Sequence, residues 1–204
     1  MFISFEGVDY SGKSTQAQLL VKRLQKAGKE ALLLREPGGT AVSEKIRTIL
    51  LEKSRIDIAQ KTELFLFSAA RCQLVNEVIL KALKSGKAIV CDRFFDSTTA
   101  YQGYGRGLDL QEIAAVNRIA TSATKPELTV LVDIGVAEIA RRRKTAGLAE
   151  DRMESAGDHF YDRVRSGYHA IAKAEPSRFV TVDGMRPPEI IHEEIWNIIT
   201  QRFH

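Results

Sequence analysis

Short apolar runs alternate along the chain with longer segments in which apolar residues recur every three or four positions. The runs are typical of strands buried on both faces, and the longer segments are typical of amphipathic helices. The expected strands are Phe2–Glu6, Glu30–Arg35, Ala88–Asp92, Leu128–Asp133 and Arg178–Asp183. The expected helices are Ser14–Ala27, Ala41–Glu52, Lys61–Lys84, Leu110–Thr121, Val136–Lys144, His159–Ala174 and Pro188–Arg202.

The regular alternation of strand and helix predicts a parallel sheet with helices on both faces. No internal repeat or linker divides the 204 residues, which are enough for one well-filled core. A single α/β domain of three layers, covering residues 1–204, is therefore expected. Ligands of such sheets bind at the carboxyl ends of the strands. The polar stretch 145–158 is the best candidate for a mobile segment.

Composition narrows the class of protein only a little. Hydrophobic residues make up 44% of the chain and charged residues 27%, as in ordinary globular proteins. No apolar run could span a membrane, no secretory signal precedes the first strand, and two cysteines suit a reducing compartment, so we expect a cytoplasmic protein. The net charge of +4 alone would favour nucleic acid, but without a basic tail we expect neither a nucleic-acid nor a membrane partner.

The segment GVDYSGKST, from Gly7 to Thr15, fits the phosphate-loop pattern G-x-x-x-x-G-K-[ST]. It follows one expected strand and opens one expected helix, so that backbone N–H groups and the helix N-terminus would face the phosphates. Lys13 is expected to reach the β- and γ-phosphates of ATP, and Ser14 to bind Mg²⁺. The residues expected to contact ATP are Gly7, Val8, Asp9, Tyr10, Ser11, Gly12, Lys13, Ser14 and Thr15.

Two residues of this loop raise separate questions. Tyr10 occupies a variable position, so its side chain can point away while its N–H faces phosphate. Asp9 needs a compensating cation if it lies beside a triphosphate. It could hold a substrate hydroxyl or Mg²⁺-bound water, or it could be a turn residue at a strand end. The sequence leaves both interpretations of Asp9 open.

Further motifs predict a second phosphate site, as in a small-molecule kinase, because a GTPase would need an N-K-x-D stretch that is absent. Asp92 and Arg93 follow the third expected strand; Asp92 could hold Mg²⁺ directly or through water, and Arg93 could clamp a phosphate. Phe67 and Arg71 share one helix face, which favours a base-stacking aromatic beside a phosphate-binding arginine over a core phenylalanine with a snorkelling arginine. The segment REPGGT follows the second expected strand and turns at Pro37, whose isomer the sequence leaves open.

Six motifs occur in order over nearly the whole chain, namely GVDYSGKST, REPGGT, EKIR, LFSAAR, DRFFDSTTAYQGYGRG and KPELTVLVD. Each is modest alone, but the set resembles bacterial thymidylate kinases. REPGG, DRF and AYQG separate it from adenylate, guanylate and shikimate kinases. The resemblance implies a five-stranded parallel sheet and a homodimer. It also implies transfer of the γ-phosphate of ATP, with Mg²⁺, to dTMP, giving dTDP and ADP as a step in dTTP synthesis.

The resemblance implies roles for the residues of the second site. Arg93, helped by Arg47, would bind the 5′-phosphate of dTMP. Phe67 would stack on thymine, and Arg71 would bond to the carbonyl edge of the base. Tyr101 would lie by the sugar, where its bulk disfavours a ribose 2′-hydroxyl. The other polar contacts, to base, phosphate and Mg²⁺-bound water, would come from Ser97, Thr98, Gln102 and Glu36.

The residues expected to act in catalysis are Lys13, Arg93, Asp9 and Arg143. Eukaryotic-type members of the family carry an arginine where this loop has Tyr10, so the resemblance places the catalytic arginine in a lid near residues 143–158. Arg143 is the first candidate, and the others are Arg141, Arg142 and Arg152. No general base is needed, because a monophosphate oxygen is already anionic at neutral pH.

Two alternatives stay open. The chain could be a small-molecule kinase for a different deoxynucleotide or for a nucleoside. A nucleoside kinase would require a base near the 5′-hydroxyl, and Glu36 or Asp92 could serve as that base. It could also be a regulatory protein that binds ATP without transferring phosphate. ADP production that depends on an acceptor would separate these alternatives.

Overall fold

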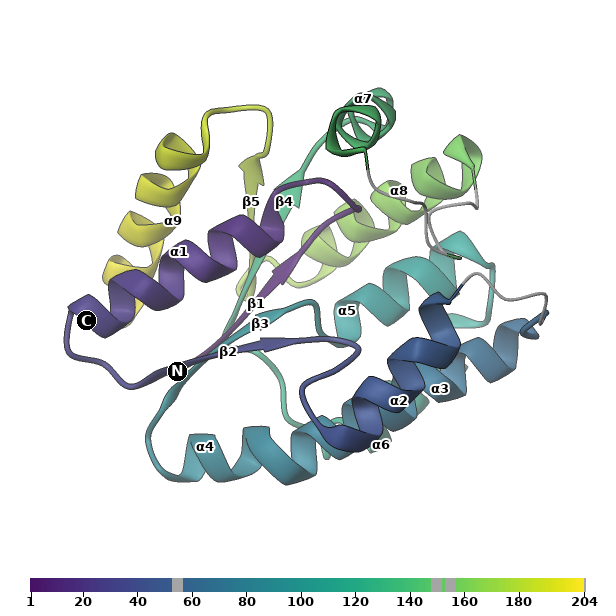
Figure 1. Ribbon diagram of the computed structural model, residues 1–204, viewed down its shortest axis with the longest axis horizontal. Coiled ribbons are helices and arrows are strands. Elements are labelled where there is room, and N and C mark those ends of the chain that lie inside the picture. Colours follow the sequence, from purple (N-terminus) through teal and green to yellow (C-terminus); the bar gives the residue numbers. More distant parts are fainter. Residues whose placement is uncertain (53–56, 148–151, 153–156, 204) are drawn as a thin grey trace.

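The computed structural model describes residues 1–52, 57–147, 152 and 157–203. Within these ranges five strands form one parallel sheet in the order β2-β3-β1-β4-β5 (Figure 1). The strands are β1 (Phe2–Glu6), β2 (Ala31–Arg35), β3 (Ala88–Asp92), β4 (Leu128–Asp133) and β5 (Phe179–Asp183). The predicted parallel sheet is therefore confirmed, with two strands beginning one residue later than expected.

Helices cover both faces of the sheet, which gives the predicted three layers (Figure 1). α1 (Lys13–Lys26) and α9 (Pro188–Phe203) cover one face. The other face is covered chiefly by α3 (Gln60–Leu74), which continues through a π-helical segment (Val75–Ile79) into α4 (Leu80–Lys84), and by α8 (Asp158–Ala174). The remaining helices are α2 (Ala41–Leu51), α5 (Phe95–Thr98), the π-helical η2 (Thr99–Gly105), α6 (Leu110–Ala120) and α7 (Val136–Ala146).

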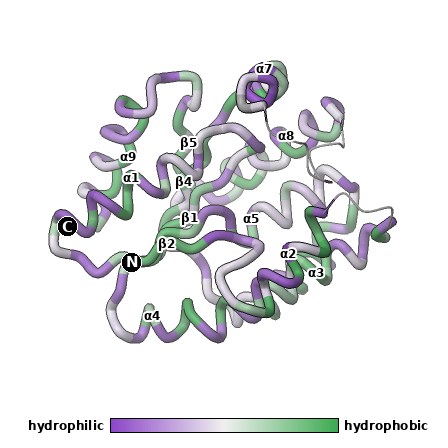
Figure 2. The backbone as a smooth tube through the Cα atoms, viewed as in Figure 1, coloured by the Kyte–Doolittle hydropathy of each residue, from purple (hydrophilic) through white to green (hydrophobic). Residues whose placement is uncertain are grey.

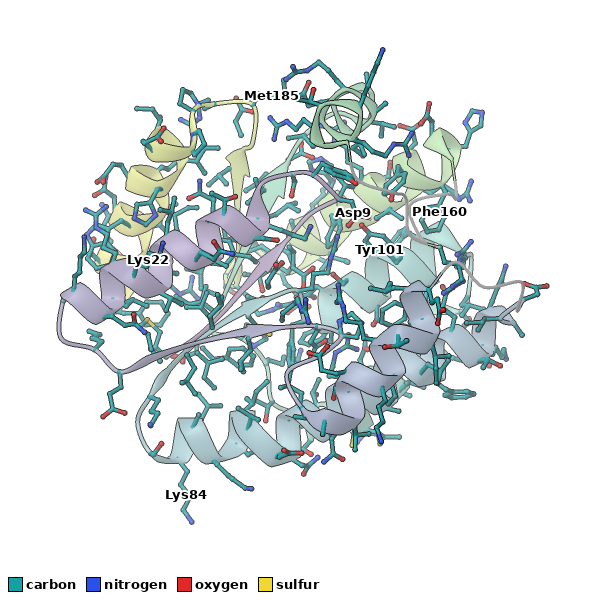
Figure 3. All side chains as sticks on the ribbon, in the orientation of Figure 1. Asp9, Lys22, Lys84, Tyr101, Phe160 and Met185 are labelled. Carbon is teal, nitrogen blue, oxygen red and sulfur yellow. The ribbon has the colours of Figure 1, made fainter. Side chains whose placement is uncertain are left out.

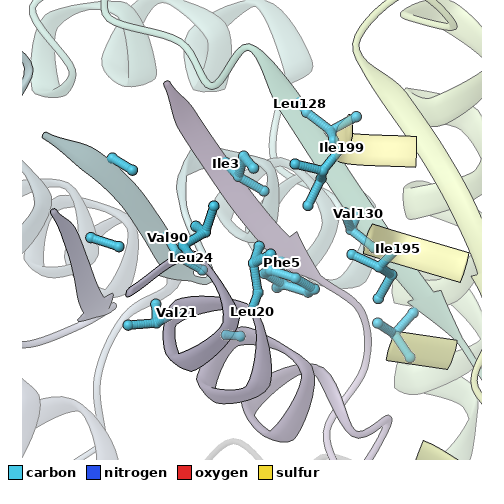
Figure 4. Packing of buried hydrophobic residues seen from close by; sticks show 14 of the residues in the cluster. Ile3, Phe5, Leu20, Val21, Leu24, Val90, Leu128, Val130, Ile195 and Ile199 are labelled. Carbon is cyan, nitrogen blue, oxygen red and sulfur yellow. The ribbon is translucent and has the colours of Figure 1, made fainter. Parts of the chain in front are cut away.

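The face under α1 and α9 shows why the apolar periods of the sequence produce this packing (Figure 4). Leu20 and Leu24, four positions apart on α1, and Ile195 of α9 pack against Phe5 and Val130 of the sheet. All five side chains are at most 2% exposed. Full burial of such a side chain contributes about 1.5–3 kcal/mol. Figure 2 shows the hydropathy pattern behind this packing: the strands inside are apolar, and the helices alternate between apolar and polar residues.

Residues 95–105 form a helix that the sequence did not predict. The segment is rich in threonine, aromatic residues and glycine, which have low helix propensity. Packing against α8 stabilises this helix despite its low propensity. The ring of Tyr101, for example, packs edge-on against Phe160 of α8. Gly105 lies so close to α8 that a Cβ there would be 2.6 Å from the Phe160 ring. This helix begins just after β3 and so brings its polar side chains to the carboxyl edge of the sheet.

The strand order decides which loops meet at that edge. β1 pairs with β3 on one side, with Phe5 opposite Asp92, so the loop after β1 lies beside the turn after β3. β2 is the next strand outward, with Arg35 opposite Asp92, which places the REPGGT segment alongside. Within the described ranges, no helix combines the length and apolar character needed to span a bilayer.

Candidate active site

A pocket of about 240 Å³ opens at the carboxyl edge of the sheet, between the loops after β1, β2 and β3. Its walls are Asp9, Lys13, Ser14, Arg35, Glu36, Pro37, Arg47, Leu51, Phe67, Arg71, Asp92, Arg93, Ser97, Thr98, Tyr101 and Gln102. Every residue that the sequence analysis assigned to the second site is in this set. Three residues of the phosphate loop (Asp9, Lys13 and Ser14) and Asp92 also line the pocket, so both expected metal ligands are included. The other phosphate-loop residues and Arg143 do not line the pocket.

The phosphate loop runs from the end of β1 to the start of α1. Its backbone turns through positive φ at Tyr10 (62°) and Gly12 (95°), which is uncommon for a tyrosine. The Lys13 ammonium is buried, 3.2 Å from the carbonyl oxygen of Val8 and 3.9 Å from Asp9 Oδ1. Burial and the neighbouring Arg93 lower the pKa of Lys13. The loop thus holds a buried cation at the N-terminus of α1.

Asp9 has the compensating cation that its position requires. Its Oδ1 accepts a hydrogen bond from Arg93 Nη2 at 2.6 Å, and its Oδ2 accepts from the hydroxyls of Tyr101 (3.0 Å) and Tyr161 (2.9 Å). Burial opposes ionisation of Asp9, but the charges of Arg93 and Lys13 outweigh it and lower the pKa to about 2. Figure 3 shows Asp9 and Tyr101 close together at this edge of the sheet. A permanent carboxylate therefore faces the pocket.

Arg93 is fixed by several protein acceptors. Its backbone adopts a positive φ of 69°, and its Nη1 donates to the Gly7 carbonyl (2.9 Å), Ser97 Oγ (3.1 Å) and the Tyr168 hydroxyl (3.2 Å). Its Nη2 also donates to the Tyr101 hydroxyl at 3.1 Å. A guanidinium held in this way is preorganised to stabilise negative charge at the pocket, without reorganisation during a reaction.

Arg71 of α3 is a second buried cation of the pocket wall. Its side chain is 2% exposed, so the alternative of a snorkelling arginine is wrong. Nε donates to Glu36 Oε2 at 2.6 Å, and Nη1 donates to Thr98 Oγ1 (3.0 Å) and Asn117 Oδ1 (3.3 Å). Burial raises the pKa of Glu36 to about 7, although Arg71 opposes this shift. Half-buried Phe67 lies one helical turn before Arg71 on α3 and also lines the pocket.

Two neighbouring contacts complete this part of the pocket wall. The Glu36–Pro37 peptide bond is cis, and Arg47 of α2 donates to the Pro37 carbonyl at 2.8 Å. Gln102 donates from Nε2 to Glu63 Oε1 at 2.9 Å. These bonds hold the polar side chains of three separate segments around one cavity.

Ser14 and Asp92 meet where the phosphate loop lies beside β3. Ser14 Oγ donates to Asp92 Oδ2 at 2.5 Å, while Asp92 Oδ1 is buried and has no hydrogen-bond partner among the described residues. Within the described part of the chain no three metal-binding side chains cluster. Mg²⁺ is usually held by one or two protein oxygens together with substrate phosphates and waters. A hydroxyl beside a carboxylate with an unused oxygen therefore fits Mg²⁺ that arrives with a nucleotide.

The family model described as thymidylate kinase matches residues 5–195, most of the chain. The chain belongs to the thymidylate kinase family. It is 49% identical to the thymidylate kinase of Chlorobaculum parvum over 203 residues, covering 96% of this chain and 93% of that protein. It is 50% identical to the thymidylate kinase of Chlorobium luteolum, covering 100% and 98%. The crystal structure of thymidylate kinase from Ehrlichia chaffeensis superposes with a TM-score of 0.78 at 34% identity, covering 98% of each chain.

The thymidylate kinase resemblance and the expected fold are thus confirmed, and the lid arginines can be compared. Arg142 of α7 contacts the phosphate loop, donating to the carbonyl oxygens of Tyr10 (3.2 Å) and Ser11 (3.4 Å). Arg143 is half-buried near the end of α7, and Arg141 is an exposed partner of Glu138. Of the expected lid, residues 148–151 and 153–156 lie outside the described residues.

Arg152, another of the lid candidates, is joined to the pocket through Glu63, which accepts a hydrogen bond from the lining residue Gln102. Its guanidinium forms an ion pair with Glu63 of α3 at 2.6 Å, and its Nε donates to the Leu50 carbonyl at 2.8 Å. Glu63 also pairs with Arg106, and these bonds, with that of Gln102, lower its pKa against the effect of burial. Glu63 therefore joins α3, the helix after β3 and Arg152.

Several residues around the kinase site were missed by sequence reasoning, namely Glu6, Glu63, Asn117, Arg142 as a loop contact, Tyr161 and Tyr168. Tyr161 and Tyr168 are seven positions apart on α8, which predicts a core-facing stripe but not hydroxyls aimed at Asp9 and Arg93. Glu6 did give a signal, since it is the one charged residue in the short, mostly apolar run FISFE.

Proposed function

We propose that this chain transfers the γ-phosphate of ATP to dTMP in the pocket described above, with ADP and dTDP as products. The observation that carries the proposal is that one pocket joins Lys13 of the phosphate loop to a second cationic site at Arg93. Two polyanions can react only where positive charge holds them together and in line. Family membership over the whole chain supports dTMP as the acceptor and ATP as the donor.

On the donor side, the backbone of the loop Gly7–Thr15 binds the phosphates of ATP, and Lys13 neutralises charge on the β- and γ-phosphates. Ser14 and Asp92 would hold Mg²⁺, which supplies further charge neutralisation when bound. The unused oxygen of Asp92 supports this assignment. Asp9 stays ionised and keeps the guanidinium of Arg93 in place between donor and acceptor.

On the acceptor side, Arg93 and Arg47 bind the 5′-phosphate of dTMP, and Tyr101 lies against the sugar. Phe67 stacks on thymine, and Arg71 donates to its carbonyl edge. Residues that supply the remaining polar contacts are Ser97, Thr98, Gln102 and Glu36. All of these residues line one pocket, and this supports their joint assignment to the binding of dTMP. The acceptor phosphate is a dianion near neutral pH and attacks without a general base.

Arg143 is proposed to stabilise the transferring phosphoryl group. Arg143→Ala is expected to lower kcat about a hundredfold, because one donor to developing charge has such an effect, with much smaller changes in KM for ATP and dTMP. Steady-state kinetics of Arg143→Ala, Arg142→Ala and the exposed control Arg141→Ala check this. An unchanged kcat for Arg143→Ala would move the role to Arg142, which already contacts the phosphate loop, or to Arg152.

We also propose that the kinase is a cytoplasmic homodimer. α3 packs between α2 and α6 (Figure 1), and these helices expose Ile49, Phe65 and Ile119 at 53%, 58% and 70%. Large apolar side chains exposed on neighbouring helices favour an interface between two copies. Sedimentation should give the mass of a dimer, and Phe65→Glu should shift it towards the monomer. A monomeric wild-type chain at assay concentration would contradict this proposal.

A coupled ADP-release assay tests the proposed reaction. ATP with Mg²⁺ is offered with dTMP, dUMP, dCMP, dGMP, dAMP, UMP or thymidine in turn. Activity on dTMP well above all the others is expected. Phosphorylation of thymidine but not of dTMP would mean that the second site belongs to a nucleoside kinase. ATP binding without any turnover would favour a regulatory protein.

A further inference from the structure

Glu6 is a fully buried carboxylate that the proposed reaction does not use. It is the last residue of β1, is 0% exposed and does not line the pocket. A buried carboxylate is costly unless it is hydrogen-bonded. Glu6 accepts from the Phe94 N–H (2.7 Å) at Oε1, and from Ser97 Oγ (2.6 Å) and the Tyr168 hydroxyl (2.9 Å) at Oε2. It therefore connects β1 to the turn after β3 and to α8.

The two hydroxyls bonded to Glu6 are the same ones that bind Arg93. Ser97 Oγ and the Tyr168 hydroxyl oxygen lie 3.1 and 3.2 Å from Arg93 Nη1. Burial raises the pKa of Glu6 to about 7, so Glu6 is mostly ionised only above pH 7. A guanidinium can only donate hydrogen bonds, and the ionised carboxylate can only accept them. Each hydroxyl therefore accepts from Arg93, while its own proton goes to Glu6 Oε2 or to the other hydroxyl, whose oxygen lies 2.9 Å away. Whichever hydroxyl donates to the other, an ionised Glu6 takes the last proton of the network, so both hydroxyls keep a lone pair for Arg93.

Glu6 also holds the backbone beside Arg93. Its Oε1 accepts from the N–H of Phe94, the residue directly after Arg93. Arg93 has a positive φ of 69°. A non-glycine residue in that region is strained unless its surroundings fix it. One carboxylate thus binds the backbone after Arg93 and orients two of the hydroxyls that hold its side chain.

We propose that Glu6 is a positioning residue for Arg93, which orients Ser97 and Tyr168 so that their hydroxyls hold the guanidinium towards the acceptor phosphate. The inference rests on the proposed function of Arg93 as the phosphate ligand. Glu6→Gln keeps the size and the Oε1 acceptor but puts an N–H₂ donor where Oε2 accepted. The hydroxyls would then accept from the amide and compete with Arg93 for the same lone pairs.

The test compares binding of dTMP with binding of thymidine by calorimetry. Glu6→Gln is expected to weaken dTMP binding about tenfold, as for loss of a hydrogen bond to a charged group, and to leave thymidine binding within about twofold. Thymidine lacks the phosphate that Arg93 binds, so the ratio of the two affinities isolates the effect on Arg93. Purely structural damage would weaken both ligands equally, and that result would overturn the proposal.

Three further variants make the result decisive. Ser4→Ala, two residues earlier on the same face of β1, loses the buried bond to Thr129 and should leave the ratio unchanged. Tyr168→Phe keeps Glu6 but removes one bridging hydroxyl, so dTMP binding should weaken about threefold. An unchanged ratio of the two affinities for Tyr168→Phe overturns the proposal even if Glu6→Gln does not fold.

In an Arg93→Met background, Glu6→Gln should have no further effect on dTMP binding. If Arg93→Met binds dTMP as tightly as the wild type, the proposed function of Arg93 is wrong. If Arg93→Met weakens dTMP binding but Glu6→Gln does not, the inference about Glu6 is wrong and the function of Arg93 stands.

Discussion

Replacement of Lys13 by alanine is expected to reduce kcat by about a thousandfold while the chain still folds. The ammonium lies at the N-terminus of α1 and faces the pocket, where charge on the β- and γ-phosphates must be neutralised. Removal of one preorganised charged donor costs about 10² to 10³ in rate, and Lys13 acts on both the leaving and the transferred phosphate. Its loss leaves Asp9 paired with Arg93, so no buried carboxylate is left alone.

The matched control is Lys22→Ala on the same helix. Lys22 is exposed and points away from the site in Figure 3, so its removal changes the net charge equally without touching the pocket. Coupled ADP release measures kcat, and a thermal melt of each variant reports folding. If Lys13→Ala kept most of the wild-type kcat, the assignment of the phosphate loop would be wrong.

The largest loss of stability is expected for Arg178→Met. Arg178 donates from Nη1 and Nη2 to the two carboxylate oxygens of Asp96 at 2.7 and 2.9 Å, and its guanidinium lies between the rings of Phe95 and Phe179. The Arg178 and Asp96 side chains are 8% and 1% exposed. Removing one partner of a buried pair costs about 3–5 kcal/mol, because it leaves an uncompensated charge. The melting temperature should fall by roughly 10 °C.

Two comparisons identify the cause of this loss. Adding Asp96→Leu to Arg178→Met removes the stranded carboxylate and should recover most of the stability. Lys87→Ala, which breaks an exposed pair with Glu30, should leave the melting temperature unchanged. A melting temperature for Arg178→Met equal to that of the wild type would mean that Asp96 is solvated. The variant should also lose kinase activity on heating, since Asp96 anchors the helix that carries Ser97 and Thr98.

Most of the architecture could be predicted because its signals are local. The strands are short apolar runs in the sequence, such as the buried AIVCD and the half-exposed edge strand ALLLR, and their positions were right to within a residue. The membership of the pocket could also be predicted, because the motifs follow strands whose carboxyl ends must meet at one edge. The family resemblance then assigned individual roles, and those roles stay predictions.

What could not be predicted depends on contacts between distant segments. The helix over residues 95–105 forms against α8, although its own composition disfavours a helix. Tyr161 and Tyr168 look like core residues in the sequence, and only the fold shows that their hydroxyls reach Asp9 and Arg93. Buried carboxylates such as Glu6 and Glu63 are recognised as hubs only when several donors from other elements converge on them.

β1 comes first of the five strands in sequence order, yet it lies at the centre of the sheet. Phe2 pairs with Ile89 and Ile3 pairs with Leu128, so both neighbours of β1 come much later in the chain. At a synthesis rate of roughly 5–20 residues per second, β1 waits on the order of ten seconds for its second neighbour. Until β3 is made, the apolar run FISF and the phosphate loop have no sheet neighbour to hold them. The nascent chain is then most open to aggregation, and both strands that flank β1 are present only once β4 has been made.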